Sequence, residues 1–165
     1  MPKLIKDHQI IDDSWNKVLE LDQLSDKGNY LIPLKLWLDN REKLTAAYKN
    51  RIGVVLPNDS EIETIAGELV ALPVIAIDFP AFTDGRGYSL ARLLRERFGF
   101  TGELRALGDV WRDQIYYLAR CGFNAFEIKA GKSLEDALAG FNDFTVNYQG
   151  AYGNPNPIYK RWAIR

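Results

Sequence analysis

Two glycines flank an arginine at the centre of the chain, in the run Asp84-Gly85-Arg86-Gly87-Tyr88-Ser89. The glycines allow the backbone to turn sharply, and serine is a residue type that caps a helix N-terminus. Free N–H groups at such a helix start, placed beside a guanidinium, are suited to bind an anion. The run therefore predicts a ligand-binding loop. The alternative is a tight loop in which Asp84 and Arg86 pair with each other.

Charged residues on the neighbouring predicted strands extend this candidate site. Because sites in parallel α/β sheets gather at the carboxyl ends of the strands, we expect Arg105 and Asp109 to lie near the loop. Asp78, which ends another predicted strand, is a further candidate. The alternatives are that Arg105 pairs with Glu103 on one strand face and that Asp109 caps the next helix.

The motifs of known enzyme classes are absent from the sequence. It has no Gly-x-Ser-x-Gly elbow and no Cys-x-x-Cys pair, and its central loop lacks the Lys-Ser/Thr ending of a phosphate-binding loop. The single histidine and the single cysteine, His8 and Cys121, are too few for a zinc site of the usual Cys/His kind. The sequence therefore predicts no metal site and leaves any reaction and any cofactor unknown.

Strand and helix patterns alternate in the elements that must position the loop. Short apolar runs at 52–56, 74–79, 103–107 and 125–129 predict strands, and each is followed by residues with helical spacing. Ser60 and Glu63 match a capping box at the start of the first of these helices. Four consecutive βα units predict an α/β fold with a mainly parallel sheet, either open or curled into a partial barrel.

The flanking segments complete a predicted single domain over residues 1–165. Residues 1–50 are expected to form a β-hairpin and a helix over 34–49, with the βα core at 51–142. Residues 143–165 read as an irregular tail rich in aromatic residues. Because aromatic side chains are costly to leave in water, we expect the tail to pack on the body or on another subunit.

Composition excludes several classes of partner. The 165 residues carry a formal net charge of −1, with 21 basic and 22 acidic side chains, so no overall field attracts nucleic acid. No apolar run approaches the roughly 20 residues that span a bilayer, and the charged N-terminal residues do not fit a signal peptide. A single cysteine favours a reducing compartment. These features predict a cytoplasmic protein.

At its centre the chain resembles an uncharacterised bacterial family, a domain of unknown function, encoded beside sulfite reductase in sulfate-assimilation operons. The resemblance rests on the Asp-Gly-Arg-Gly-Tyr-Ser run at 84–89, Leu-Arg at 94–95 and Gly-Glu-Leu-Arg-Ala at 102–106, followed by Gly-Asp-Val at 108–110 and Arg-Cys-Gly-Phe at 120–123. The chain departs from the family pattern at two places. Trp111-Arg112 follows the Gly-Asp-Val run, and Asn124 stands where family members commonly have an acidic residue.

The resemblance implies a role but no chemistry. Some members are labelled as oxidoreductases of sulfite reduction, on the basis of gene neighbourhood. It therefore implies an accessory protein of sulfur assimilation that binds a partner, such as sulfite reductase, through arginine-rich and aromatic surfaces. The alternative is a small protein or enzyme that binds an oxyanion, such as sulfite, sulfate or a phosphorylated metabolite, at the central loop.

Overall fold

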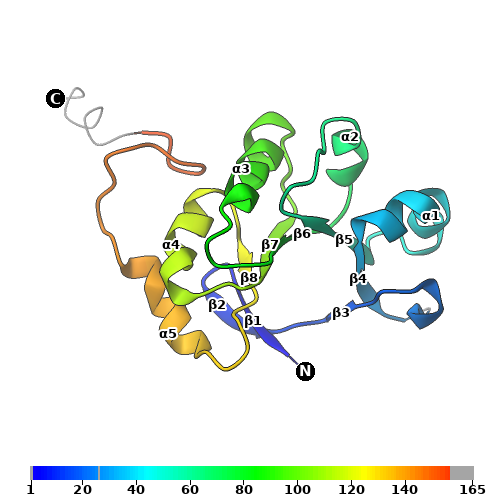
Figure 1. Ribbon diagram of the computed structural model, residues 1–165, viewed down its shortest axis with the longest axis horizontal. Coiled ribbons are helices and arrows are strands. Elements are labelled where there is room, and N and C mark those ends of the chain that lie inside the picture. Colours follow the sequence, from blue (N-terminus) through cyan, green and yellow to red (C-terminus); the bar gives the residue numbers. More distant parts are fainter. Residues whose placement is uncertain (1, 26, 157–165) are drawn as a thin grey trace.

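The computed structural model describes residues 2–25 and 27–156, which form a mixed α/β fold around one curved sheet (Figure 1). Its strands are β1 (Lys3–Lys6), β2 (Gln9–Asp12), β3 (Trp15–Lys17), β4 (Asn29–Pro33), β5 (Ile52–Pro57), β6 (Val74–Phe79), β7 (Glu103–Gly108) and β8 (Ala125–Phe126). Its α-helices are α1 (Leu34–Ala47), α2 (Ala66–Leu69), α3 (Arg86–Arg92), α4 (Arg112–Arg120) and α5 (Leu134–Ala139). A π-helical turn, Leu93–Arg97, continues α3, and 3₁₀ turns lie at Leu21–Gln23 and Gly140–Asn142.

The strands follow the order β2-β1-β8-β7-β6-β5-β4-β3. Strands β3 to β8 are parallel and each pairs with its sequence neighbour, whereas β1 runs antiparallel to both β2 and β8. Right-handed connections between neighbouring parallel strands place their helices on one face of a sheet. Figure 1 shows the helices around the outside of the sheet, which curls into an open half-barrel. The predicted mainly parallel α/β sheet and N-terminal hairpin are confirmed.

Several predicted elements differ in the structure. Strands β3 and β4 lie in a segment that carries no clear strand pattern, and β8 has only two residues. The Ser60 hydroxyl donates to the Pro57 carbonyl at 2.7 Å, so it closes a turn, and α2 begins only at Ala66. The first and last of the four expected βα units are therefore much shorter than predicted.

The hydrophobic core lies between the helices and the outer face of the sheet. Alternate strand residues, among them Val54, Ile75, Ile77 and Ala106, are fully buried in this core. Side chains alternate between the two faces of a strand, so the residues between them point to the concave face. Arg105 takes such a position, in register with Ala76 and Ala125 on the strands beside it.

Arg105 is the central residue of the concave face and is only 1% exposed. Its Nη1 donates to Asp13 Oδ2 at 2.7 Å, and its Nε donates to Glu103 Oε1 at 2.8 Å. Lys6 pairs with the other oxygen of Glu103 at 2.8 Å, which balances two cations against two carboxylates. Burial lowers the pKa of Arg105, but the hydrogen bond that Arg105 donates to Asp13 and the charge of Glu103 outweigh this effect and raise the pKa.

These ion pairs join parts of the sheet that share no backbone hydrogen bonds. Asp13 follows β2 and Trp15 begins β3, so the Asp13–Arg105 contact fixes the connection that runs between the two edge strands. Lys17 on β3 pairs with Glu127 after β8 at 2.5 Å, although four strands separate β3 from β8 in the sheet. The open side of the half-barrel is thus bridged by side chains.

A second arginine, Arg95, is buried although its helix position predicts a solvent-exposed side chain. It is 6% exposed and donates to the carbonyl oxygens of Phe100, Gly102 and Gly122, at 2.6, 2.9 and 2.8 Å. Buried carbonyl groups need such donors, because a loop offers them no regular backbone partner. Arg95 therefore fixes the turns that lead into β7 and β8.

We predict that Arg105→Leu lowers the free energy of unfolding by about 3–5 kcal/mol, because it leaves the buried Asp13 without its cation and Glu103 with Lys6 alone. Arg92→Leu is the control: Arg92 is paired with Glu96 on the surface, so its loss should cost less than about 1 kcal/mol. Urea unfolding followed by circular dichroism measures both values. Equal losses in the two variants would contradict the structural role of Arg105.

Candidate functional site

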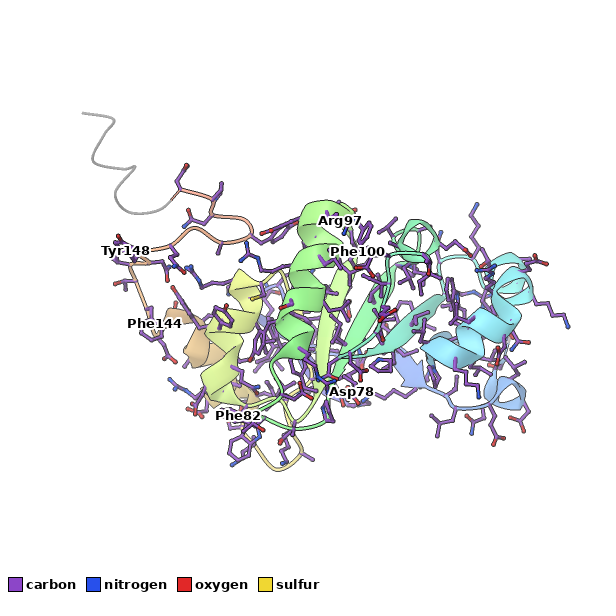
Figure 2. The ribbon with its side chains drawn as sticks, turned by 45° about the horizontal axis from the view of Figure 1, so that its top comes forward. Asp78, Phe82, Arg97, Phe100, Phe144 and Tyr148 are labelled. Atoms are coloured by element: carbon purple, nitrogen blue, oxygen red, sulfur yellow. The ribbon has the colours of Figure 1, made fainter. Side chains whose placement is uncertain are left out.

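The loop after β6 connects the carboxyl ends of three neighbouring strands. Phe82 N–H donates to Asp109, after β7, at 3.1 Å, and Arg86 Nη1 donates to Asp59, after β5, at 3.1 Å. Figure 2 shows Asp78 and Phe82 at one end of the sheet and Arg97 and Phe100 at the other. Of the site residues predicted from sequence, the structure brings Asp84, Arg86 and Asp109 to this edge.

Arg86 binds the carboxylate of Asp84 through two hydrogen bonds. Its Nε lies 3.0 Å from Oδ1 and its Nη2 lies 2.7 Å from Oδ2. Hydrogen bonds from Arg86, and secondarily from Asn58, hold the pKa of Asp84 well below its usual range. An oxyanion at Arg86 would therefore have to displace two carboxylates, those of Asp84 and Asp59. The arrangement matches the alternative in which Asp84 and Arg86 pair with each other.

The other four residues of the loop sequence shape the start of α3. Gly85 is the N-cap of this helix, so Ser89 lies inside the helix and does not cap it. Gly87 is buried, and a Cβ there would lie 2.7 Å from the ring of Phe79. Tyr88 packs with its ring centroid 5.4 Å from that of Phe79 and 5.1 Å from that of Tyr117. Gly87 and Tyr88 thus fix α3 against the sheet.

Asp109 belongs to a cluster of ionic and aromatic contacts at the same edge. Its carboxylate accepts from Lys129 Nζ at 2.7 Å and from Trp111 Nε1 at 2.5 Å. The bond from Lys129, followed by that from Trp111, lowers the pKa of Asp109. The Lys132 ammonium lies 4.1 Å from the centroid of the Trp111 ring, which is a cation–π contact. The N-cap of α4 is Trp111, so Asp109 does not cap that helix.

Arg105 does not join the other predicted site residues. Its guanidinium is buried on the concave face with Asp13 and Glu103, which satisfies the predicted alternative of a pair with Glu103. The position of Arg105 within its predicted strand gave no sign that a distant aspartate, Asp13, would pair with it.

Asp78 is the residue before the end of β6, on the concave side, and is half-buried. It lies against Gly108, where a Cβ would come within 2.6 Å of Asp78 Oδ1. Burial raises its pKa; the charge of Lys17 opposes this shift and that of Glu127 adds to it. Asp78 is thus a carboxyl group whose ionised form is disfavoured by its surroundings.

Several exposed apolar side chains lie together on α4 and the segment that follows the last 3₁₀ turn. We call it the aromatic surface, and it comprises Tyr116, Tyr117, Phe144, Val146 and Tyr148. Tyr117, Phe144 and Tyr148 are 54%, 63% and 73% exposed. With Arg120 and neighbouring polar residues, its tyrosines and Phe144 line a shallow hollow of ≈ 400 Å³. Figure 2 shows Phe144 and Tyr148 on the segment beside α4, far from Asp78.

Contacts with α4 hold this segment in place. Tyr116 packs on Phe144 with ring centroids 5.0 Å apart, and its hydroxyl donates to Asn147 at 2.5 Å. Arg120 donates to the Gln149 carbonyl at 2.9 Å. The sequence predicted an aromatic tail that packs on the body or on another subunit. Phe144 and Tyr152 contact Tyr116 and Arg95, whereas Val146 and Tyr148 are exposed, and residues 157–165 lie outside the described residues. The exposed side of α4 was not predicted, although Tyr117 falls outside the apolar face defined by Ile115 and Leu118.

The chain matches a family of bacterial proteins of unknown function, DUF934, over residues 53–159. It belongs to this family. The matched segment contains the central loop, α4 and the whole of the aromatic surface, and it confirms the resemblance to an uncharacterised bacterial family. No curated protein and no solved structure matches the chain.

Residues 2–25 and 27–156 contain no group of three or more His, Cys, Asp or Glu side chains arranged to hold a metal ion. No helix in these same ranges has the length and apolar character needed to cross a membrane.

The raised pKa of Asp78 gives a pH-dependent prediction. A carboxyl group whose pKa is higher in the folded than in the unfolded chain contributes stability at low pH and loses it as pH rises through the folded pKa. Asp78→Asn should therefore raise the urea midpoint at pH 7, and the gain should vanish below about pH 4, near the ordinary pKa of aspartate. Asp84→Asn, which removes a carboxyl of lowered pKa, should shift the midpoint at pH 7 the opposite way. Midpoints that change equally in both variants would refute this assignment.

Proposed function

We propose that this protein is a partner-binding accessory protein of sulfur assimilation, and that it binds sulfite reductase through the aromatic surface. The observation that carries the proposal is the exposure of Tyr117, Phe144 and Tyr148 around one hollow. Exposed apolar patches of this kind mark protein interaction sites, because leaving them in water is unfavourable. The role in sulfur assimilation rests on what the family resemblance implies.

The composition of the aromatic surface supports a protein partner. Tyrosine and arginine are enriched among the residues that contribute most to protein–protein affinity, and Arg120 stands beside the tyrosines. The hollow is shallow, and it lies between a helix and an extended segment. Such a surface suits the side chains of another protein better than it suits a small metabolite, which is usually enclosed more fully.

The central loop supports the surface and is not the primary contact in this proposal. Tyr88 of the loop packs on Tyr117 of α4, with ring centroids 5.1 Å apart. The alternative proposal, a small oxyanion bound at Arg86, requires that the guanidinium leave both Asp84 and Asp59. The aromatic surface needs no such rearrangement, which favours partner binding.

We predict that the double variant Phe144→Ala, Tyr148→Ala binds sulfite reductase of the same organism at least about 30-fold more weakly than the wild type, which corresponds to about 2 kcal/mol for central interface residues. Its thermal midpoint should stay close to that of the wild type, because both side chains are exposed. Biolayer interferometry with purified proteins measures the affinity.

Phe82→Ala is the matched control, since Phe82 is an aromatic residue 45% exposed at a different place on the molecule. It should bind like the wild type. Equal binding by the double variant would show that another surface makes the contact. Failure of the wild type itself to bind sulfite reductase would refute the proposed partner.

A further inference from the structure

Two lysines and two aromatic residues meet at the carboxyl edge of the sheet. Phe82 follows β6, Trp111 follows β7, and Lys129 and Lys132 follow β8. Loops at the carboxyl ends of neighbouring parallel strands are where α/β proteins commonly bind their ligands. We call these four residues the edge cluster.

Phe82 presents an exposed ring on a backbone that is held in place. The residue is 45% exposed. Its N–H donates to Asp109 at 3.1 Å, and its carbonyl accepts from Nε2 of the buried Gln114 at 3.3 Å. Its ring also contacts that of Trp111, with centroids 5.9 Å apart. An aromatic ring fixed in this way offers a flat ligand a stacking surface at little cost in entropy.

Both lysines place their ammonium groups on Trp111. Nζ of Lys129 lies 5.3 Å from the centroid of the indole ring, and Nζ of Lys132 lies 4.1 Å from it. Lys129 N–H donates to the Val110 carbonyl at 3.0 Å, which ties the turn that carries the lysines to the loop after β7. Lys132 N–H closes this turn on the Lys129 carbonyl at 3.2 Å. Two like charges are thus held beside one ring.

A single carboxylate faces these two charges. Asp109 pairs with Lys129 at 2.7 Å, and it also accepts from the indole N–H and from the backbone of Phe82. Among the described residues no carboxylate forms an ion pair with Lys132, which is exposed. Lys129 keeps two further donors, because an ammonium group has three. An anion can therefore contact both lysines without displacing a carboxylate.

We propose that the edge cluster binds a nucleoside monophosphate. The base stacks on the exposed ring of Phe82, and the phosphate contacts the ammonium groups of Lys129 and Lys132. In the described part of the chain neither ammonium group makes a cation–π contact with Phe82, so the ring and the anion of the ligand have to be separated, as the sugar separates them in a nucleotide. The edge cluster shares no residue with the aromatic surface, so the proposal is independent of the proposed partner.

The test is a titration of the full chain, labelled with ¹⁵N, with adenosine monophosphate. We expect a saturable change in the Trp111 indole N–H resonance, with an affinity that falls as salt is added, because salt screens the contacts of the phosphate with exposed lysines. Adenosine and inorganic phosphate, which each carry one part of the probe, should bind at least about tenfold more weakly than the whole nucleotide.

Two variants of the edge cluster separate the contributions of the phosphate and the base. Lys132→Gln should weaken binding about tenfold, the effect of a charged hydrogen bond, and Phe82→Ala at least about fivefold, the effect of base stacking. Both residues are exposed, so the thermal midpoints should stay close to that of the wild type. Lys43→Gln is the matched control, because it removes the same charge from an exposed position on α1, and it should bind like the wild type.

Several results would overturn the proposal. If the wild type shows no saturable change at millimolar nucleotide, the edge cluster does not bind this class of ligand. If adenosine or phosphate alone binds as tightly as the nucleotide, the lysines and Phe82 do not act on one ligand. If Lys132→Gln or Phe82→Ala keeps the wild-type affinity, the probe lies elsewhere. If Lys43→Gln weakens binding as much as Lys132→Gln, the charge of the whole molecule attracts the probe.

Discussion

The contact of Arg105 with Asp13 and Glu103 is the constraint on which the curvature of the sheet depends. An open sheet with helices on one face leaves its other face to be covered, and here the cover is the short connection between β2 and β3. A guanidinium that is 1% exposed holds this connection by its carboxylate, and Lys6 completes the charge balance. Because a buried ion pair tolerates neither loss of a partner nor loose geometry, it fixes where the N-terminal strands lie. The Lys17–Glu127 pair adds a second bridge across the same side.

The arrangement of the loops at the strand ends and of α4 depends on the sheet that these ion pairs hold in place. With the sheet fixed, the loop after β6 spans the ends of β5 and β7 through Arg86 and Phe82, and α3 rests on Phe79 where Gly87 leaves room. Tyr88 then meets Tyr117, so the loop supports the outer helix. The charged groups of the central loop satisfy one another, whereas the aromatic side chains of the next layer remain exposed.

The sequence predicted the parts of this fold that local patterns encode. The spacing of apolar residues alone predicts the strands rich in Val and Ile, such as β5 and β6, and the amphipathic helix α4. Partners distant in sequence are not: Arg105 and Asp13 are 92 positions apart, and an arginine on a strand gives no sign of burial. Arg95 also has the position of a surface residue, yet three carbonyl groups from loops enclose it. The glycines of the central loop suggested a ligand-binding site. In the structure, Gly87 is required because a side chain at this position would clash with the ring of Phe79. The aromatic surface arises from two segments, and only their juxtaposition reveals it.

Hydrogen exchange with and without sulfite reductase tests the central claim, that the aromatic surface is where this protein meets its partner. Amides of residues 113–120 and 144–149 are predicted to exchange more slowly in the complex, because the partner would cover α4 and the segment beside it. The amides of the central loop should keep their exchange rates within error. Protection confined to residues 80–89, or no protection anywhere, would contradict the account.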